Sequence, residues 1–139
     1  MKKKYLIVIA DYYKNISDGL LKSALKFIPK TSRVKIIKVP GVFEIPVTIS
    51  KNIKKYDAFI ALGCVIKGQT PHFNFISEAT INSIMNLSVT NKKPIGNGII
   101  TCLNKKQAIE RSDLNKKNKG GEAAKALLSV LKILKNDTQ

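Results

Sequence analysis

The sequence predicts an α/β fold, a three-layer αβα sandwich built on a four-stranded parallel sheet. Two segments, Tyr5–Ala10 and Ala58–Ile66, are almost continuously apolar and rich in β-branched residues. Such runs are typical of strands that are buried on both faces of a sheet. Strand-like and helix-like segments also alternate along the 139 residues, which indicates parallel strands covered by helices on both sides. In folds of this kind, ligands bind beyond the carboxyl ends of the strands.

The first half of the chain contains two of the expected strands and two helices. After the first strand, Ser17 is expected to cap a helix that ends before Pro29, because serine is a favoured N-cap and proline cannot continue a helix. Val34–Val39 is the second expected strand. Phe43–Lys54 is expected to be a helix, whose Pro46 is tolerated only in the first turn.

The second half adds two strands and three helices. Ala58–Ile66 is the third expected strand and Pro94–Thr101 is the fourth. The loop Gly68–Pro71 leads into a long helix between them, with apolar or small residues at helical spacing: Phe73, Ile76, Thr80, Ile84 and Leu87. Lys105–Ser112 is expected to be a short helix. A last helix is expected to start near Gly121, with an apolar stripe that comprises Ala124, Leu127, Leu128, Leu131 and Leu134.

The length predicts a single domain over residues 1–139. The formal net charge is +16, from 25 lysines and arginines against 9 acidic residues. A charge of this size suggests a polyanion-binding module, but only Arg33 and Arg111 are arginines. Nucleic-acid recognition relies on the planar arginine fork and on interleaved aromatic residues, which the sequence does not show. The lysines therefore suit solvated helix faces, and we expect no nucleic-acid partner.

Several other classes are excluded by what the sequence lacks. The apolar runs are too short to span a membrane, and no small-residue cleavage site follows the basic start of the chain. Cys64 and Cys102 are far apart and form neither a metal motif nor a disulfide framework. These features predict a cytoplasmic, reduced protein with no metal site. Dinucleotide, Walker and nucleophile-elbow motifs are also missing, which argues against hydride transfer and nucleotide hydrolysis.

Two residues at expected strand ends are candidates for the chemistry. His72 is the only histidine, and it lies between a buried strand and a long helix. A lone histidine is more often structural, but an imidazole at a strand end can accept and donate a proton near neutral pH. Glu44 is an acid in an apolar segment. It serves either as a first-turn acid favoured by the helix dipole or as an acceptor for ligand hydroxyls. The neighbouring Phe43 either packs in the core or lines a ligand site, and the sequence favours neither.

Two basic residues near the C-terminus are candidates for binding an anion. Arg111 stands out because arginine is scarce, and it either pairs with Glu110 or Asp113 or clamps a phosphate. Lys119 opens the last helix, where backbone N–H groups favour an anion. Lysine is so common in this chain that Lys119 alone is weak evidence.

Two longer segments resemble one enzyme family. Val39–Pro46 and Leu62–Phe73 closely resemble the 6,7-dimethyl-8-ribityllumazine synthases of riboflavin biosynthesis, and Gln107–Arg111 and Asn118–Gly120 match the family's C-terminal signature. The resemblance runs from about residue 4 to residue 135. It implies a flavodoxin-like fold and a transferase without metal or redox cofactor. The implied reaction joins 5-amino-6-(D-ribitylamino)uracil to 3,4-dihydroxy-2-butanone 4-phosphate, with release of phosphate and water.

The resemblance also implies a role for individual residues. His72 carries protons as the catalytic residue, and the phosphate is bound by Gln69, Thr70, Arg111 and Lys119. The other substrate is bound by Tyr12, Val42, Phe43, Glu44, Cys64, Val65, Ile66 and Asn97. Tyr13 competes with Tyr12 as the ring that stacks on the pyrimidine. Asn97 stands where many members of the family have phenylalanine, so it offers hydrogen bonds in place of stacking.

The same resemblance implies an assembly. The family forms homopentamers with sites between subunits, so that Asn97 and Arg111 come from the neighbour of the subunit that gives His72. The short loop 112–119 favours an icosahedral capsid of pentamers, whereas the Gly96–Gly98 segment favours smaller assemblies, and both stay open. Riboflavin synthase is a candidate partner. The alternative function is a non-catalytic paralogue that binds flavin or lumazine.

Overall fold

The computed structural model describes residues 2–68 and 71–137. It contains a four-stranded parallel sheet with the strand order β2-β1-β3-β4. The strands are β1 (Lys4–Ala10), β2 (Arg33–Val39), β3 (Ala58–Ile66) and β4 (Ile95–Cys102). The helices are α1 (Lys14–Phe27), α2 (Ile45–Lys51), α3 (His72–Asn91), α4 (Lys105–Ser112) and α5 (Lys119–Asp137), and a short 3₁₀ turn η1 (Val42–Glu44) precedes α2. The predicted three-layer sandwich is confirmed.

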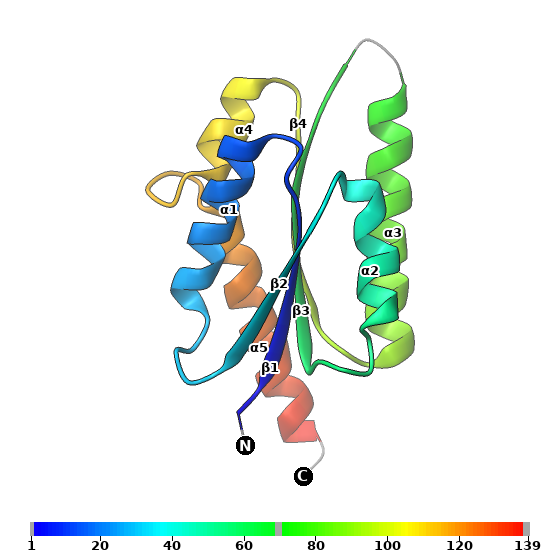
Figure 1. Ribbon diagram of the computed structural model, residues 1–139, viewed down its shortest axis with the longest axis vertical. Coiled ribbons are helices and arrows are strands. Elements are labelled where there is room, and N and C mark those ends of the chain that lie inside the picture. Colours follow the sequence, from blue (N-terminus) through cyan, green and yellow to red (C-terminus); the bar gives the residue numbers. More distant parts are fainter. Residues whose placement is uncertain (1, 69–70, 138–139) are drawn as a thin grey trace.

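The two faces of the sheet are covered by different helices. Helices α1, α4 and α5 pack on one face, and α2 and α3 pack on the other (Figure 1). Successive residues of a strand point to opposite faces, so Tyr5, Ile7 and Ile9 of β1 join the first core while Leu6 and Val8 join the second. Because both faces are covered, β1 and β3 need apolar residues at every position, and this explains their continuous apolar runs.

The two edges of the sheet differ in charge. The edge strand β2 exposes Arg33, Lys35 and Lys38, and charged residues on an edge prevent pairing with another strand. The opposite edge strand, β4, has no charged residue. The β4 edge therefore lacks the protection that β2 has against a second chain.

Three helices have boundaries that differ from the sequence prediction. The expected cap at Ser17 is wrong, since α1 begins at Lys14 and the buried Ser17 hydroxyl donates a hydrogen bond to the Ala10 carbonyl at 2.7 Å. This bond ties the helix to the end of β1 and satisfies the hydroxyl inside the core. The helix expected over Phe43–Lys54 spans only Ile45–Lys51, because Phe43 and Glu44 belong to the η1 turn. The last helix begins at Lys119, two residues before the expected start.

Two glycines allow α5 to pack closely against its neighbours. A Cβ atom on Gly120 would overlap the backbone carbonyl of Leu20 in α1, and one on Gly96 would lie 2.6 Å from the Ala123 carbonyl oxygen. Such contacts are shorter than side chains tolerate, so the positions of α1, α5 and β4 depend on these glycines.

Many of the lysines lie on exposed helix faces, as the sequence predicted. Lys22 and Lys26 are exposed on α1, and Lys125 and Lys132 are exposed on α5. The Lys125 ammonium lies 4.4 Å from the centre of the Phe27 ring, where it covers an aromatic surface. Of the helices in the described part of the chain, none has the length and apolar character that crossing a membrane requires.

Candidate functional site

The carboxyl ends of the four parallel strands lie together at one edge of the sheet, at the top of Figure 1. The segment after β1 carries Tyr12, and the segment after β2 carries Glu44. His72 is the first residue of α3, which follows β3, and Arg111 lies in α4, which follows β4. This edge is where ligands bind in such folds, and most of the sequence-predicted site residues are placed there.

Tyr12 and Tyr13 face different surroundings. The Tyr12 side chain is 76% exposed, whereas Tyr13 packs against the core on the α1 face of the sheet. Burial raises the pKa of the Tyr13 hydroxyl, with smaller contributions from Cys64 and Tyr12. The two rings meet edge to face, with their centres 4.9 Å apart. This packing holds Tyr12 at the surface and supports it as the ring available for stacking.

The η1 turn places one apolar residue in the core and two residues outside it. Val42 is buried, whereas Phe43 is 62% exposed. Glu44 is half-buried at the start of α2. Its carboxylate folds back over Gly41, whose backbone oxygen accepts a bond from the Glu44 N–H. A half-buried carboxylate at the start of a helix can accept hydrogen bonds from ligand hydroxyls.

The end of β3 leads toward His72. Cys64 is buried, and Val65 and Ile66 are half-buried as the strand leaves the core. Burial raises the pKa of the Cys64 thiol to about 12, and contact with the Cys102 thiol adds to this increase while Arg111 opposes it. His72 is exposed in the first turn of α3. The phosphate-binding candidates Gln69 and Thr70 lie outside the described residues.

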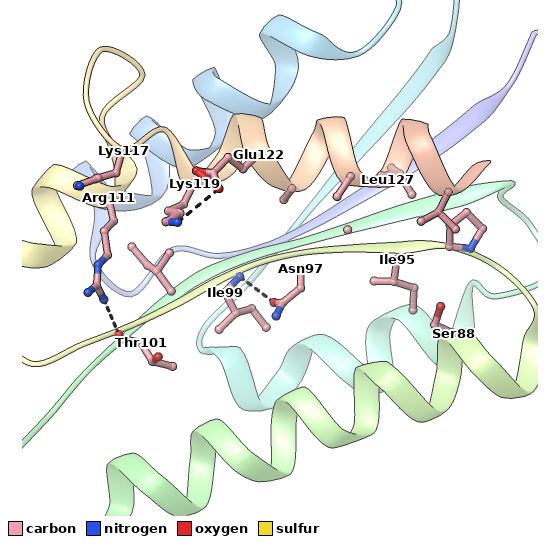
Figure 2. Close-up of a pocket in the computed structure, with 16 residues that line it drawn as sticks. Ser88, Ile95, Asn97, Ile99, Thr101, Arg111, Lys117, Lys119, Glu122 and Leu127 are labelled. Atoms are coloured by element: carbon pink, nitrogen blue, oxygen red, sulfur yellow. Dashed lines mark hydrogen bonds and ion pairs between the residues drawn. The ribbon is translucent and has the colours of Figure 1, made fainter. Parts of the chain in front are cut away.

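A cavity of about 840 Å³ follows the outer side of β4 between α3 and α5 (Figure 2). Its lining includes Asn97, Arg111 and Lys119. The Asn97 side chain is exposed, and its Oδ1 accepts a hydrogen bond from the Ile99 N–H at 3.1 Å. The cavity has the size of a small-molecule site.

Arg111 reaches from α4 to the end of β4. Its Nη1 donates a hydrogen bond to the Thr101 carbonyl at 2.8 Å, and the same nitrogen lies 3.7 Å from Cys102 Sγ. The alternative reading as an ion pair with Glu110 or Asp113 does not match these contacts, since neither carboxylate is bound to Arg111 in the described part of the chain. The guanidinium charge is therefore not neutralised by a carboxylate and is available to an anion.

Lys119 opens α5 beside the same cavity. Its Nζ lies 3.4 Å from Glu122 Oε1, with both side chains largely exposed. An exposed pair of this kind is weak, at most about 1 kcal/mol. Lys119 can therefore exchange this partner for a stronger anion, and the N–H groups of the first turn of α5 add to the positive potential.

The candidate residues form two groups. Tyr12, Glu44 and His72 lie at the carboxyl edge of the sheet, whereas Asn97 is the third residue of β4. It lies five positions before Cys102, or about 16 Å along the strand at roughly 3.3 Å per residue. None of the first three residues lines the cavity that Asn97 and Arg111 share. One chain thus presents two partial sites.

Comparisons with known proteins give the family. The sequence pattern of the 6,7-dimethyl-8-ribityllumazine synthases matches residues 2–135. The chain belongs to this family. A 6,7-dimethyl-8-ribityllumazine synthase of Bartonella tribocorum is 43% identical over 97% of this chain and 93% of its own length. The synthase of Buchnera aphidicola is 42% identical over 96% of this chain and 88% of its own length, and that of Zymomonas mobilis is 40% identical over 95% and 96%.

Sequence reasoning missed several residues that the structure places beside the candidates. Thr101 and Cys102 hold the Arg111 side chain, and Lys117 and Glu122 line the same cavity. The scarcity of arginine pointed to Arg111, but no comparable signal marked its partners. A backbone carbonyl has no sequence signature, and a buried cysteine is normally an apolar core residue.

Proposed function

We propose that the protein condenses 5-amino-6-(D-ribitylamino)uracil with 3,4-dihydroxy-2-butanone 4-phosphate, the penultimate step of riboflavin biosynthesis. The products are 6,7-dimethyl-8-ribityllumazine, one phosphate and two waters, which balances the atoms of the two substrates. The observation that carries the proposal is the family match over residues 2–135. Relatives that bear the synthase name and align along nearly the whole chain support it.

His72 is the proposed proton carrier. Imine formation, loss of phosphate and the second loss of water all require proton transfer, and an imidazole can perform it in both directions. His72 is exposed at the start of α3 and lies at the carboxyl edge of the sheet, where a substrate can reach it. The remaining rate gain comes from holding two substrates in the correct orientation.

Arg111 is the proposed anchor of the phosphate, with Lys119 in support. Both residues line the cavity beside β4, and a guanidinium binds phosphate through two parallel hydrogen bonds. Gln69 and Thr70 complete the proposed phosphate site, as the family resemblance implies. In the sequence they stand between β3 and α3, shortly before His72.

The pyrimidine and its ribityl chain are assigned to the segments after β1, β2 and β3. The exposed Tyr12 ring stacks on the pyrimidine, and the Glu44 carboxylate accepts hydrogen bonds from the ribityl hydroxyls. Phe43 and the backbone of Val42 line the same side. The backbone of Cys64, Val65 and Ile66 reads the edge of the pyrimidine. These assignments are supported by their common position at the carboxyl edge of the sheet.

The complete site is proposed to form between two copies of the chain in a homopentamer. Asn97 and Arg111 line a cavity that His72 does not line, which supports this arrangement, and so does the uncharged β4 edge. Helix α3 supports it as well. It contains no lysine or arginine, although the chain has 25, and it exposes Phe75, Met85 and Val89. Apolar residues exposed on a helix without basic residues, in a chain this rich in lysine, are typical of a surface that binds another protein.

The finer setting is also part of the proposal. We place the enzyme in the cytoplasm, supported by two cysteines that are free thiols. Riboflavin synthase is the partner that would consume the product. Sedimentation velocity distinguishes a single pentamer, a pair of pentamers and an icosahedral shell by their masses.

The proposed function is tested by mixing the purified protein with both substrates. Fluorescent 6,7-dimethyl-8-ribityllumazine and free phosphate should appear together, faster than in the absence of protein. If the product binds tightly but no turnover is seen, the chain is the non-catalytic paralogue. If neither turnover nor product binding is seen, the proposed function is wrong.

Arg111→Ala is expected to weaken binding of the phosphate substrate. Loss of a charged hydrogen-bonding partner corresponds to about a 10- to 100-fold increase in KM for the butanone phosphate, with a much smaller change in KM for the pyrimidine. Initial rates measured as each substrate is varied give both values. Arg33→Ala removes the same charge from the opposite edge of the sheet and serves as the matched control. Equal effects of the two substitutions would show that only general charge attraction is involved.

A further inference from the structure

The Arg111 side chain is held at two points by β4. Its Nη1 donates to the Thr101 carbonyl, 2.8 Å away, and contacts Cys102 Sγ at 3.7 Å. In Figure 2 the side chain extends from α4 and ends at the Thr101 backbone. Among the described residues, both contacts of the guanidinium involve Nη1, which leaves Nε and Nη2 for a ligand. Adjacent N–H groups of this kind form the paired hydrogen bonds that phosphate accepts.

Only one of the two contacts depends on the type of residue at its position. Any residue at position 101 supplies a carbonyl, whereas the sulfur belongs to Cys102 alone. Cys102 is 1% exposed and lies in the core on the α1, α4 and α5 face of the sheet. Its side chain is therefore fixed by packing, and the sulfur cannot move away from the guanidinium without disturbing the core.

A second thiol, that of Cys64, lies near Cys102. Among the described residues, no carboxylate is bound to Arg111. Cys102 is paired in register with Ile66, and Cys64 lies two positions earlier in β3 on the same face. The raised pKa of Cys64, about 12, results mainly from burial and keeps that thiol protonated at neutral pH. A thiolate here would compete with phosphate for the guanidinium. The protonated thiol leaves the positive charge of Arg111 free for a substrate.

We propose that Cys102 is a positioning residue for phosphate binding. Its sulfur accepts a hydrogen bond from Arg111 Nη1 and, with the Thr101 carbonyl, orients the guanidinium so that Nε and Nη2 face the cavity. The inference rests on the role proposed for Arg111. Cys102 touches no substrate and acts only through the arginine.

The test compares Cys102→Ala, which removes the acceptor, with Cys102→Ser, which keeps one. Loss of a single hydrogen bond corresponds to a roughly two- to tenfold increase in KM for the butanone phosphate. In Cys102→Ala we expect this increase, with kcat and the KM for the pyrimidine within about twofold of wild type. Cys102→Ser should bring the KM for the phosphate substrate back toward the wild-type value.

Ile60→Val provides a control for general loss of packing. Ile60 belongs to the same core but pairs with Gly96, far along the sheet from Cys102. If Cys102→Ala and Ile60→Val change all three kinetic constants alike, or if Cys102→Ala leaves the KM for the phosphate substrate unchanged, the positioning role is wrong.

Binding of inorganic phosphate separates this inference from the proposed function. Titration followed by phosphorus NMR measures the dissociation constant without turnover. Weaker binding by Cys102→Ala than by wild type supports the positioning role even if the protein makes no lumazine. Normal lumazine formation by wild type with unchanged phosphate binding by Cys102→Ala overturns the positioning role and leaves the proposed function intact.

Discussion

Replacing His72 with alanine is expected to reduce kcat about 100-fold, at the lower end of the 10²–10⁴-fold range for removal of a general acid–base group. The lower end is expected because orientation of two bound substrates continues to accelerate the reaction. Stability should change little, since the side chain is exposed in the first turn of α3. Rates at saturating substrate give kcat, and urea unfolding of the same preparation gives the free energy of unfolding.

Asn74→Ala is the matched control for this substitution. Asn74 lies in the same turn of α3 and is also exposed, so it reports any general effect on the start of the helix. If His72→Ala keeps the wild-type kcat, His72 is not the proton carrier. If His72→Ala and Asn74→Ala both lose activity and stability, His72 has a role in folding.

Gly120→Ala is expected to cause the largest loss of stability. The new Cβ atom would overlap the Leu20 backbone carbonyl, and the nearest other atoms of that residue lie 3.0 and 3.1 Å away. Because backbone atoms cannot rotate away, α1 and α5 must separate and expose the core around Leu127. Overpacking typically costs about 1–3 kcal/mol. We expect about 3 kcal/mol, which exceeds the gain of roughly 1 kcal/mol from replacing a helical glycine with alanine.

Urea unfolding at a fixed chain concentration measures this loss, because the stability of an oligomer depends on concentration. Gly68→Ala is the control, since a Cβ atom there meets no atom within 4 Å. Its free energy of unfolding should lie within about 0.5 kcal/mol of the wild-type value, as is usual for surface substitutions. If Gly120→Ala were as stable as Gly68→Ala, the close crossing of α1 and α5 would not be a determinant of the fold.

The fold was predictable because burial constrains the sequence strongly. The strands β1 and β3 are covered on both faces, so their runs from Tyr5 to Ala10 and from Ala58 to Ile66 read as strands without ambiguity. The start of α1 was not predictable. Ser17 fits the local rule for a helix cap, but its hydroxyl instead binds the carbonyl of Ala10, seven residues earlier. A tertiary hydrogen bond of this kind leaves no local pattern.

The candidate site was predictable only where residue type is informative. Arg111 was found because the chain has two arginines, and His72 because it has one histidine. Tyr12 and Tyr13 could not be separated by sequence, and their different burial now favours Tyr12 as the exposed ring. Cys102 was missed because its contact with Arg111 joins β4 to α4 across nine positions.

We propose that two copies of the chain complete the enzyme's site. Co-expressing His72→Ala chains with Arg111→Ala chains tests it most directly, because each chain then carries one intact partial site. In mixed assemblies, random pairing of neighbours should restore complete sites at about a quarter of the interfaces. At a butanone phosphate concentration well below the wild-type KM, where Arg111→Ala is also nearly inactive, we predict lumazine formation near that fraction of the wild-type rate, well above the rate of either variant alone. Mixed assemblies that are no more active than the separate variants would contradict the account.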